Sequence, residues 1–235
     1  MTRKPLTIAL VLLTISAVPT LADPVALQDP DTSVYSGWNA DWDPSGAVRD
    51  VRVIEVDRNA STVTLWIEKD FGPYEIVDDE VEFPVAPVSF TIDTDSGQPP
   101  VSQIILQGET IVNNSGASWS HFNWIIMQPA AADFLIAESG AWDVQPFAAR
   151  LWRDAAGGVA QGNLARSLTA WDGSVPTGTT FAPTVDLVID VTEQGRQSGF
   201  TLKQTVFPEP SCLAMLAVTV GSLLARRRRR RKPLS

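Results

Sequence analysis

The chain has 235 residues, with 18 Lys and Arg against 27 Asp and Glu and a net charge of −9 at neutral pH. A single cysteine and a single histidine exclude a disulfide framework and a histidine-rich zinc site. The length allows one domain with a sizeable hydrophobic core.

The N-terminus has the pattern of a secretory signal peptide. Arg3 and Lys4 precede an apolar run over residues 6–18 that only Thr and Ser interrupt. Thr20-Leu21-Ala22 then supplies the small residues that signal peptidase reads. We therefore predict export through the Sec translocon and cleavage by signal peptidase after Ala22. The alternative, a retained N-terminal anchor, is disfavoured because the apolar run is short.

Residues 23–207 carry the acidic character of the chain. They contain nine Lys and Arg and 26 Asp and Glu, which gives a net charge near −17. A body of this charge repels nucleic acid and anionic lipid, and it suits solubility outside the cell or cation binding. The single cysteine, Cys212, lies beyond this segment. Packing must therefore stabilise the body without disulfides.

The pattern within this segment predicts β-strands. Two β-rich runs, 51–57 and 62–68, flank Arg58-Asn59-Ala60-Ser61, which predicts a hairpin with a four-residue turn. Apolar residues alternate along the second run and so share one face. Residues 130–137 could form one short helix. Further strands are predicted at 88–92, 103–112, 119–127, 185–191 and 200–205.

Short strands separated by Pro, Gly and Asp turns indicate an all-β fold. We predict a single antiparallel β-sandwich domain over residues 23–207, of the jelly-roll or immunoglobulin-like type. The signal peptide, 1–22, and a C-terminal segment, 208–235, flank this domain. The sequence contains no internal repeat and no linker long enough to divide the body.

His121 is the side chain whose ordinary pKa lies closest to neutrality. It lies between Trp119 and Trp124 in a predicted strand, and no serine occupies a nucleophile-elbow pattern. The partners that a catalytic histidine needs are missing. A structural or surface role is therefore favoured, and we predict no catalytic residue.

Two acidic turns are candidates for a weak calcium site. Residues 41–46 begin like an EF-hand loop, but the twelfth position is Arg52 instead of a bidentate glutamate, which excludes an EF-hand. A second Asp-rich turn spans residues 93–97. Asp, Ser and Gly are also what ordinary turns require. Calcium is therefore a hypothesis, no other cofactor is expected, and the candidate ligands are Asp41, Asp43, Asp93 and Asp95.

The C-terminus has three parts in a fixed order. Pro208-Glu209-Pro210 precedes an apolar run over residues 212–225, and a cationic segment follows. A helix of this length reaches only about 21 Å, short of the roughly 30 Å hydrocarbon core of a bilayer. Arginine side chains can extend a short span by snorkelling, and cations beside a membrane segment stay cytoplasmic. We predict a transmembrane helix whose stop consists of Arg226, Arg227, Arg228, Arg229, Arg230 and Arg231.

An arginine run also suits an arm that binds nucleic acid. Such arms do not normally follow an apolar helix, so we expect no nucleic-acid partner.

This three-part terminus resembles the PEP-CTERM sorting signal of exported bacterial proteins. The resemblance covers the last 28 residues and places the sorting motif at Pro208, Glu209 and Pro210. It implies an exosortase-like membrane enzyme that cuts near the motif in a Gram-negative host. It also implies a link to exopolysaccharide and biofilm. Residues 111–122 further resemble a strand–turn–strand motif of some PEP-CTERM exported proteins, in which Asn and Gly accept a positive φ.

These features predict a protein that is transiently anchored in the inner membrane and then reaches the cell envelope, the outer surface or the extracellular matrix. Its expected role is structural or binding, not enzymatic. The alternative is an extracellular carbohydrate-active enzyme that uses paired carboxylates, although 26 acids guarantee close pairs by abundance alone. Tryptophans could line a sugar platform, but core packing explains most of them.

Overall fold

The computed structural model describes residues 23–77, 80–128, 130–139 and 144–209. These residues form an all-β structure apart from α1 (Gly195–Ser198), a single turn of helix, so the predicted fold class is confirmed at this level. The predicted signal peptide, Pro210, the apolar run and residues 226–231 lie outside the described residues. Within the described ranges, no helix has the length and apolar character needed to span a membrane.

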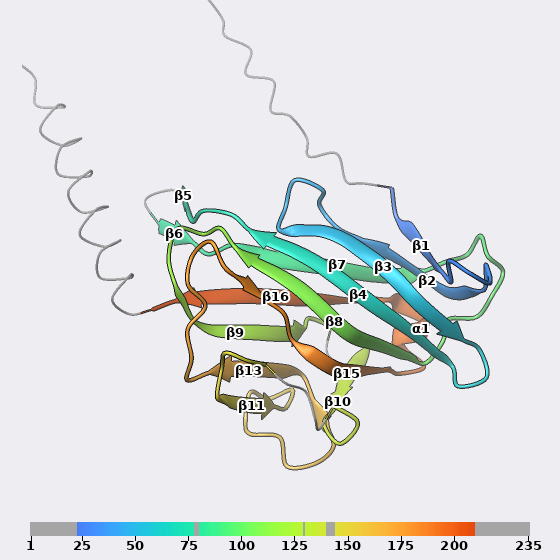
Figure 1. Cartoon of the computed structure of the whole chain (residues 1–235). Coiled ribbons are helices and arrows are strands. Elements are labelled where there is room, and N and C mark those ends of the chain that lie inside the picture. Colours follow the sequence, from blue (N-terminus) through green and yellow to red (C-terminus); the bar gives the residue numbers. More distant parts are fainter. Residues whose placement is uncertain (1–22, 78–79, 129, 140–143, 210–235) are drawn as a thin grey trace, which may run out of the picture.

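Two seven-stranded sheets account for most of the fold (Figure 1). The first sheet contains, in spatial order, β1 (Val25–Gln28), β2 (Tyr35–Asp41), β7 (Val85–Ile92), β16 (Phe200–Pro208), β9 (Trp119–Ile126), β13 (Ser167–Trp171) and β11 (Ala149–Arg153). The second contains β12 (Leu164–Ala165), β10 (Ala132–Leu135), β15 (Thr184–Val191), β8 (Gln103–Asn113), β4 (Thr62–Phe71) and β3 (Val48–Asp57), with β14 (Thr180–Phe181) paired to β8. A separate hairpin consists of β5 (Glu75–Val77) and β6 (Glu80–Glu82).

The predicted hairpin is present. The two β-rich runs lie within β3 and β4, which pair antiparallel with Asp57 opposite Thr62 across the expected turn. Along β4, buried and half-buried residues alternate, and Val63, Leu65 and Ile67 are fully buried. The period of two in the sequence therefore identified the inner face of this strand correctly.

Two expectations are wrong. First, β4 and β8 pair in parallel, with Thr62 opposite Gln103 and Phe71 opposite Asn113, so the second sheet is mixed instead of antiparallel throughout. The chain between these strands crosses to the first sheet, where it forms β7, before it returns. Second, the segment expected to form a short helix contains β10, which pairs with β15 on one side and β12 on the other. Pairing with two neighbours overrides the helix propensity of its alanines.

Buried apolar residues of both sheets form a hydrophobic core among the described residues. Phe71 of β4 meets Trp119 and Phe122 of β9 edge-to-face, with ring centroids 5.3 and 5.8 Å apart. Phe181 of β14 lies 5.5 Å from Phe122. These contacts join the sheets across the core, and each fully buried aromatic side chain contributes about 2–3 kcal/mol of hydrophobic stabilisation.

The predicted turn between the strands at 103–112 and 119–127 is also present. Gly116 has a φ of +83°, in the region that favours glycine. Asn113 donates from its side chain to the carbonyls of Ala117 (2.9 Å) and Val175 (2.8 Å). The Trp119 indole donates to the Ser115 hydroxyl at 2.9 Å. The turn therefore fixes the start of β9 through buried polar contacts.

Candidate functional site

The first two residues of the predicted sorting motif belong to the folded body. Pro208 is buried and is the last residue of β16. Its carbonyl accepts a hydrogen bond from the Ser120 hydroxyl at 3.2 Å. Glu209 donates its backbone N–H to the Ser118 carbonyl at 2.9 Å, and its carboxylate accepts from the Ser174 hydroxyl. We name Pro208, Glu209 and these three serines the motif clasp.

The clasp lies at the end of a central strand. β16 pairs with β7 on one side and β9 on the other. The register against β9 becomes irregular between Phe207 and Pro208, and proline has no N–H with which to continue the ladder. The exposed Phe207 ring lies 6.0 Å from Phe83, which follows β6. Figure 1 shows the β5–β6 hairpin at the same end of the molecule as the end of β16.

His121 lies beside the clasp but outside the core. It is exposed, is opposite Phe207 of β16, and has its Nδ1 2.8 Å from the Ser120 hydroxyl oxygen. Trp119, Phe122 and Trp124 are fully buried. These three aromatic side chains are therefore unavailable as a platform for a sugar ring beside His121.

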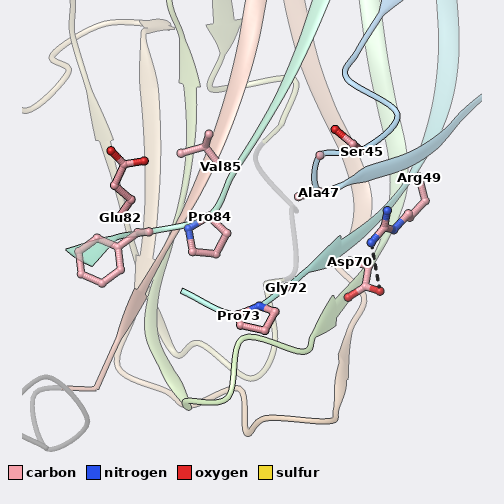
Figure 2. A pocket seen from close by; sticks show the side chains of 11 residues that line it. Ser45, Ala47, Arg49, Asp70, Gly72, Pro73, Glu82, Pro84 and Val85 are labelled. Carbon is pink, nitrogen blue, oxygen red and sulfur yellow. Dashed lines mark ion pairs between the residues drawn. The ribbon is translucent and has the colours of Figure 1, made fainter. Parts of the chain in front are cut away.

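A pocket of about 390 Å³ lies near this end of the molecule (Figure 2). Asp70 of β4 contributes a carboxylate, which lies 3.6 Å from the Arg49 guanidinium and accepts from the Asn114 amide at 2.8 Å. Glu82 contributes a second, exposed carboxylate, and Figure 2 shows it well apart from Asp70. The pocket is lined by Ser45, Gly46, Ala47, Arg49, Asp70, Gly72, Pro73, Glu82, Phe83, Pro84 and Val85.

The structure does not bring the four calcium candidates together. Asp41 is opposite Ser89 at one end of the β2–β7 ladder, whereas Asp93 donates its N–H to Gly37 at the other end. Gly37 and Asp41 are four residues apart along β2, which corresponds to about 13 Å of extended strand. Among the described residues, no group of three or more His, Cys, Asp or Glu could hold a metal ion.

Two of these carboxylates accept hydrogen bonds within the turns to which they belong. Asp43 accepts from the Ser45 hydroxyl and backbone N–H at 2.6 and 2.8 Å, and these bonds hold the pKa of Asp43 below its usual range. Asp93 accepts from the N–H groups of Asp95 and Ser96 at 3.1 and 3.2 Å. Ordinary turn chemistry therefore accounts for both positions.

Calcium and magnesium are therefore expected to raise the melting temperature of the body by equal amounts at equal ionic strength, because both screen the repulsion of a strongly acidic protein. Thermal unfolding monitored over increasing concentrations of each ion is the measurement. A larger shift with calcium that disappears in Asp41→Asn would contradict this expectation and identify a specific site.

A second polar cluster, which the sequence did not reveal, lies inside the core. Lys69 of β4 and Glu109 of β8 form an ion pair in which both side chains are fully buried. The other oxygen of Glu109, Oε2, accepts from the Trp124 indole at 2.7 Å. Gln204 of β16 donates its amide to Oε1 at 2.7 Å. We name these four residues the core cluster.

The core cluster connects the two sheets. Lys69 and Glu109 belong to the second sheet, and Trp124 and Gln204 are directly opposite each other in the first. Burial lowers the pKa of Lys69, and the charge and hydrogen bond of Glu109 oppose that shift. The alternation along β4 could have identified Lys69, since it continues the series Val63, Leu65, Ile67 on the inner face.

Comparisons of the chain with protein-family models, with curated proteins and with solved structures found no match. Any functional assignment therefore rests on the geometry and chemistry of this chain's own residues.

Proposed function

We propose that residues 23–207 form one β-sandwich body of an exported cell-envelope or extracellular-matrix protein with a structural or binding role. Segment 208–235 is its sorting signal, which anchors it in the membrane until an exosortase-like enzyme processes it. Exopolysaccharide is the expected partner of the released body. The observation that supports this proposal is the motif clasp, since the resemblance to a sorting signal begins at the last residue of β16.

The position of β16 suits a protein that is held by its C-terminal end. Its ladder runs from Phe200 to Thr205 against β7 and from Leu202 to Pro208 against β9. A force applied at the motif is therefore shared by hydrogen bonds on both sides of the strand. An edge strand would have only one such ladder to resist detachment.

The clasp also predicts how processing is controlled. A processing enzyme binds an extended backbone in its cleft, and the two prolines favour that conformation. Pro208 is buried and Glu209 is held by Ser118 and Ser174, so the end of β16 must leave the sheet before it can be bound. Such local openings cost much less free energy than global unfolding.

Replacement of Pro208-Glu209-Pro210 by three alanines is expected to leave a larger, membrane-retained species, because the enzyme no longer recognises its motif. Blotting of fractionated cells is the measurement. Ser174→Ala is the matched control, since it removes one hydrogen bond of the clasp and leaves the motif intact. We expect Ser174→Ala to be processed at least as fast as the unaltered protein.

Normal processing and release of the alanine variant would show that the motif is not read. Slower processing of Ser174→Ala would mean that the enzyme recognises the folded clasp instead of a detached strand. Glu209→Gln removes the negative charge of the motif but keeps the clasp, because a glutamine oxygen can still accept from the Ser174 hydroxyl. In the same processing assay it therefore separates the effect of the charge from the effect of the hydrogen bond.

A carbohydrate-active enzyme is the second candidate function, because the pocket contains two carboxylates in unlike surroundings, Asp70 beside Arg49 and the exposed Glu82. Incubation of the purified body with the producer's own exopolysaccharide tests it through the chain length of the polymer. Shortening that disappears in Asp70→Asn or Glu82→Gln, but persists in His121→Ala outside the pocket, favours the enzyme. Retention on the polymer without shortening favours the binding role.

A further inference from the structure

We propose that Lys69 and Gln204 condense to a side-chain amide that joins β4 to β16 through the core, with Glu109 as the proton carrier. This covalent modification would form within the folded body. It does not depend on the function proposed above.

Both reacting groups donate a hydrogen bond to the same oxygen atom of Glu109. Glu109 Oε1 accepts from Lys69 Nζ and also from Gln204 Nε2, the latter at 2.7 Å. The Trp124 indole donates to Oε2 and so fixes the orientation of the carboxylate. The amine and the carboxamide are therefore adjacent and are both linked to the group that can move protons between them. Such fixed proximity replaces the encounter that the same groups would need in solution.

The surroundings exclude water. Lys69, Trp124 and Gln204 have no exposed surface, and Glu109 is 2% exposed. Leu202 and Val206 flank Gln204 on the inner face of β16 and are buried as well. A dry site prevents hydrolysis of the carboxamide and lets the carboxylate interact strongly with both partners.

The side chains have the reactivity that the step needs. An amine attacks only in its neutral form, and burial lowers the pKa of Lys69 toward that form. The Gln204 carbonyl oxygen, Oε1, is buried and has no hydrogen-bond partner among the described residues. This carboxamide is therefore only partly satisfied in the fold.

The atoms of the step balance without any further reactant. Lys69 passes one proton to Glu109, and the neutral Nζ attacks Cδ of Gln204. A carbon–nitrogen bond to Nζ forms as the bond to Nε2 breaks. Glu109 first gives its proton to Nε2, which leaves as ammonia, and then takes a second proton from Nζ. Glu109 keeps one proton, and nothing is oxidised or reduced.

The new bond would fasten β16, whose last residue is the first residue of the predicted sorting motif. β16 ends at Pro208, four residues after Gln204. An amide at Gln204 ties this strand to the opposite sheet, so a force on the motif could detach only the last few residues. The body contains no cysteine, and this bond would be its covalent crosslink.

Peptide mapping of the unfolded full-length protein tests the proposal. Digestion after glutamate releases residues 69–75 with Lys69 and a second peptide that begins at Gln194 and contains Gln204, since the Glu209–Pro210 bond resists cleavage. We expect these peptides to remain joined, with a combined mass lower by one ammonia molecule. Glu109→Gln removes the proton carrier and Lys69→Met removes the amine, so both variants should give two separate peptides.

Gln204→Glu provides a third variant, in which any joined product should be lighter by one water molecule instead of one ammonia. Recovery of both peptides unmodified from the folded, unaltered protein would overturn the proposal, whether or not the variants fold. Attachment of residues 69–75 to a peptide that contains Glu109, with loss of water, would also overturn it. A joined pair that persists in Glu109→Gln would refute the role of Glu109.

Discussion

Glu109→Leu is expected to lower the free energy of unfolding by about 3–5 kcal/mol relative to the body without the proposed amide, the usual cost of removing one partner from a buried ion pair. The variant leaves the Lys69 amine in the core without its carboxylate. It also removes the acceptor of the Trp124 indole and of the Gln204 amide. Denaturant unfolding of the purified body is the measurement.

Two matched variants separate the causes of this loss. Glu55 is an exposed glutamate of β3, and Glu55→Leu should change the free energy of unfolding by less than about 0.5 kcal/mol. The double variant Lys69→Met with Glu109→Leu removes both charges, so it should be more stable than Glu109→Leu alone. Glu109→Leu and the double variant both lack the proposed proton carrier. The difference in stability between them therefore reports the cost of the unpaired Lys69 amine.

The stability of Glu109→Leu should also depend on pH in a defined direction. Burial already lowers the pKa of Lys69 below its ordinary value of 10.5, and loss of the opposing carboxylate lowers it further. Between the folded pKa and 10.5, the unfolded chain then binds more protons than the folded one. Stability of this variant therefore rises with pH through that window. A flat profile, or a single variant as stable as the double one, would contradict a desolvated amine at this position.

The long strands were predictable because their sequences carry a period of two and a recognisable turn. The β3–β4 hairpin follows from its alternation and four-residue turn, and β16 follows from the apolar alternation after Gly199. The short strands lack such a pattern. β10 and β12 have four and two residues, and neighbouring strands fix them instead of their own sequences.

The core cluster was only half predictable. Lys69 falls at one of the alternate positions of β4 whose side chains point inward, so its position in the strand alone places it in the core. Glu109 does not continue the alternation of β8, since Leu106, three residues earlier, is also buried. An irregularity in register between Leu65 and Trp66 of β4, where the facing residues are Leu106 and Gly108, changes the face of the strand. Such a bulge leaves no dependable mark in one sequence.

The motif clasp shows a different limit. The C-terminal pattern predicts a sorting motif that includes Pro208 and Glu209, and the predicted boundary separates both residues from the body after residue 207. In the structure, β16 continues to Pro208, and Glu209 is bonded to Ser118 and Ser174. Contacts between segments distant in sequence decide where the body ends, and periodicity within one strand cannot reveal them.

Gly199→Ala is expected to destabilise the body by about 2–5 kcal/mol, the sum of backbone strain and a steric clash. Gly199 precedes β16 and has φ of 74° and ψ of 178°, a conformation almost restricted to glycine. A Cβ at this position would lie 2.4 Å from the backbone carbonyl oxygen of Phe90 in β7. Backbone atoms in a central ladder cannot move aside, so the start of β16 must shift.

Gly157→Ala is the control for backbone strain alone. Gly157 also has a positive φ, +82°, but a Cβ there would meet no atom within 4 Å. It should therefore cost only the left-handed penalty of about 1–2 kcal/mol. Thermal unfolding of both variants measures the difference, which reports the close approach of Gly199 to β7 together with its more restricted backbone conformation. Equal losses would mean that β7 and the start of β16 can separate without cost. In that case β7 would not hold the start of β16 firmly, and the strand that carries the predicted motif would be secured mainly by its pairing with β9.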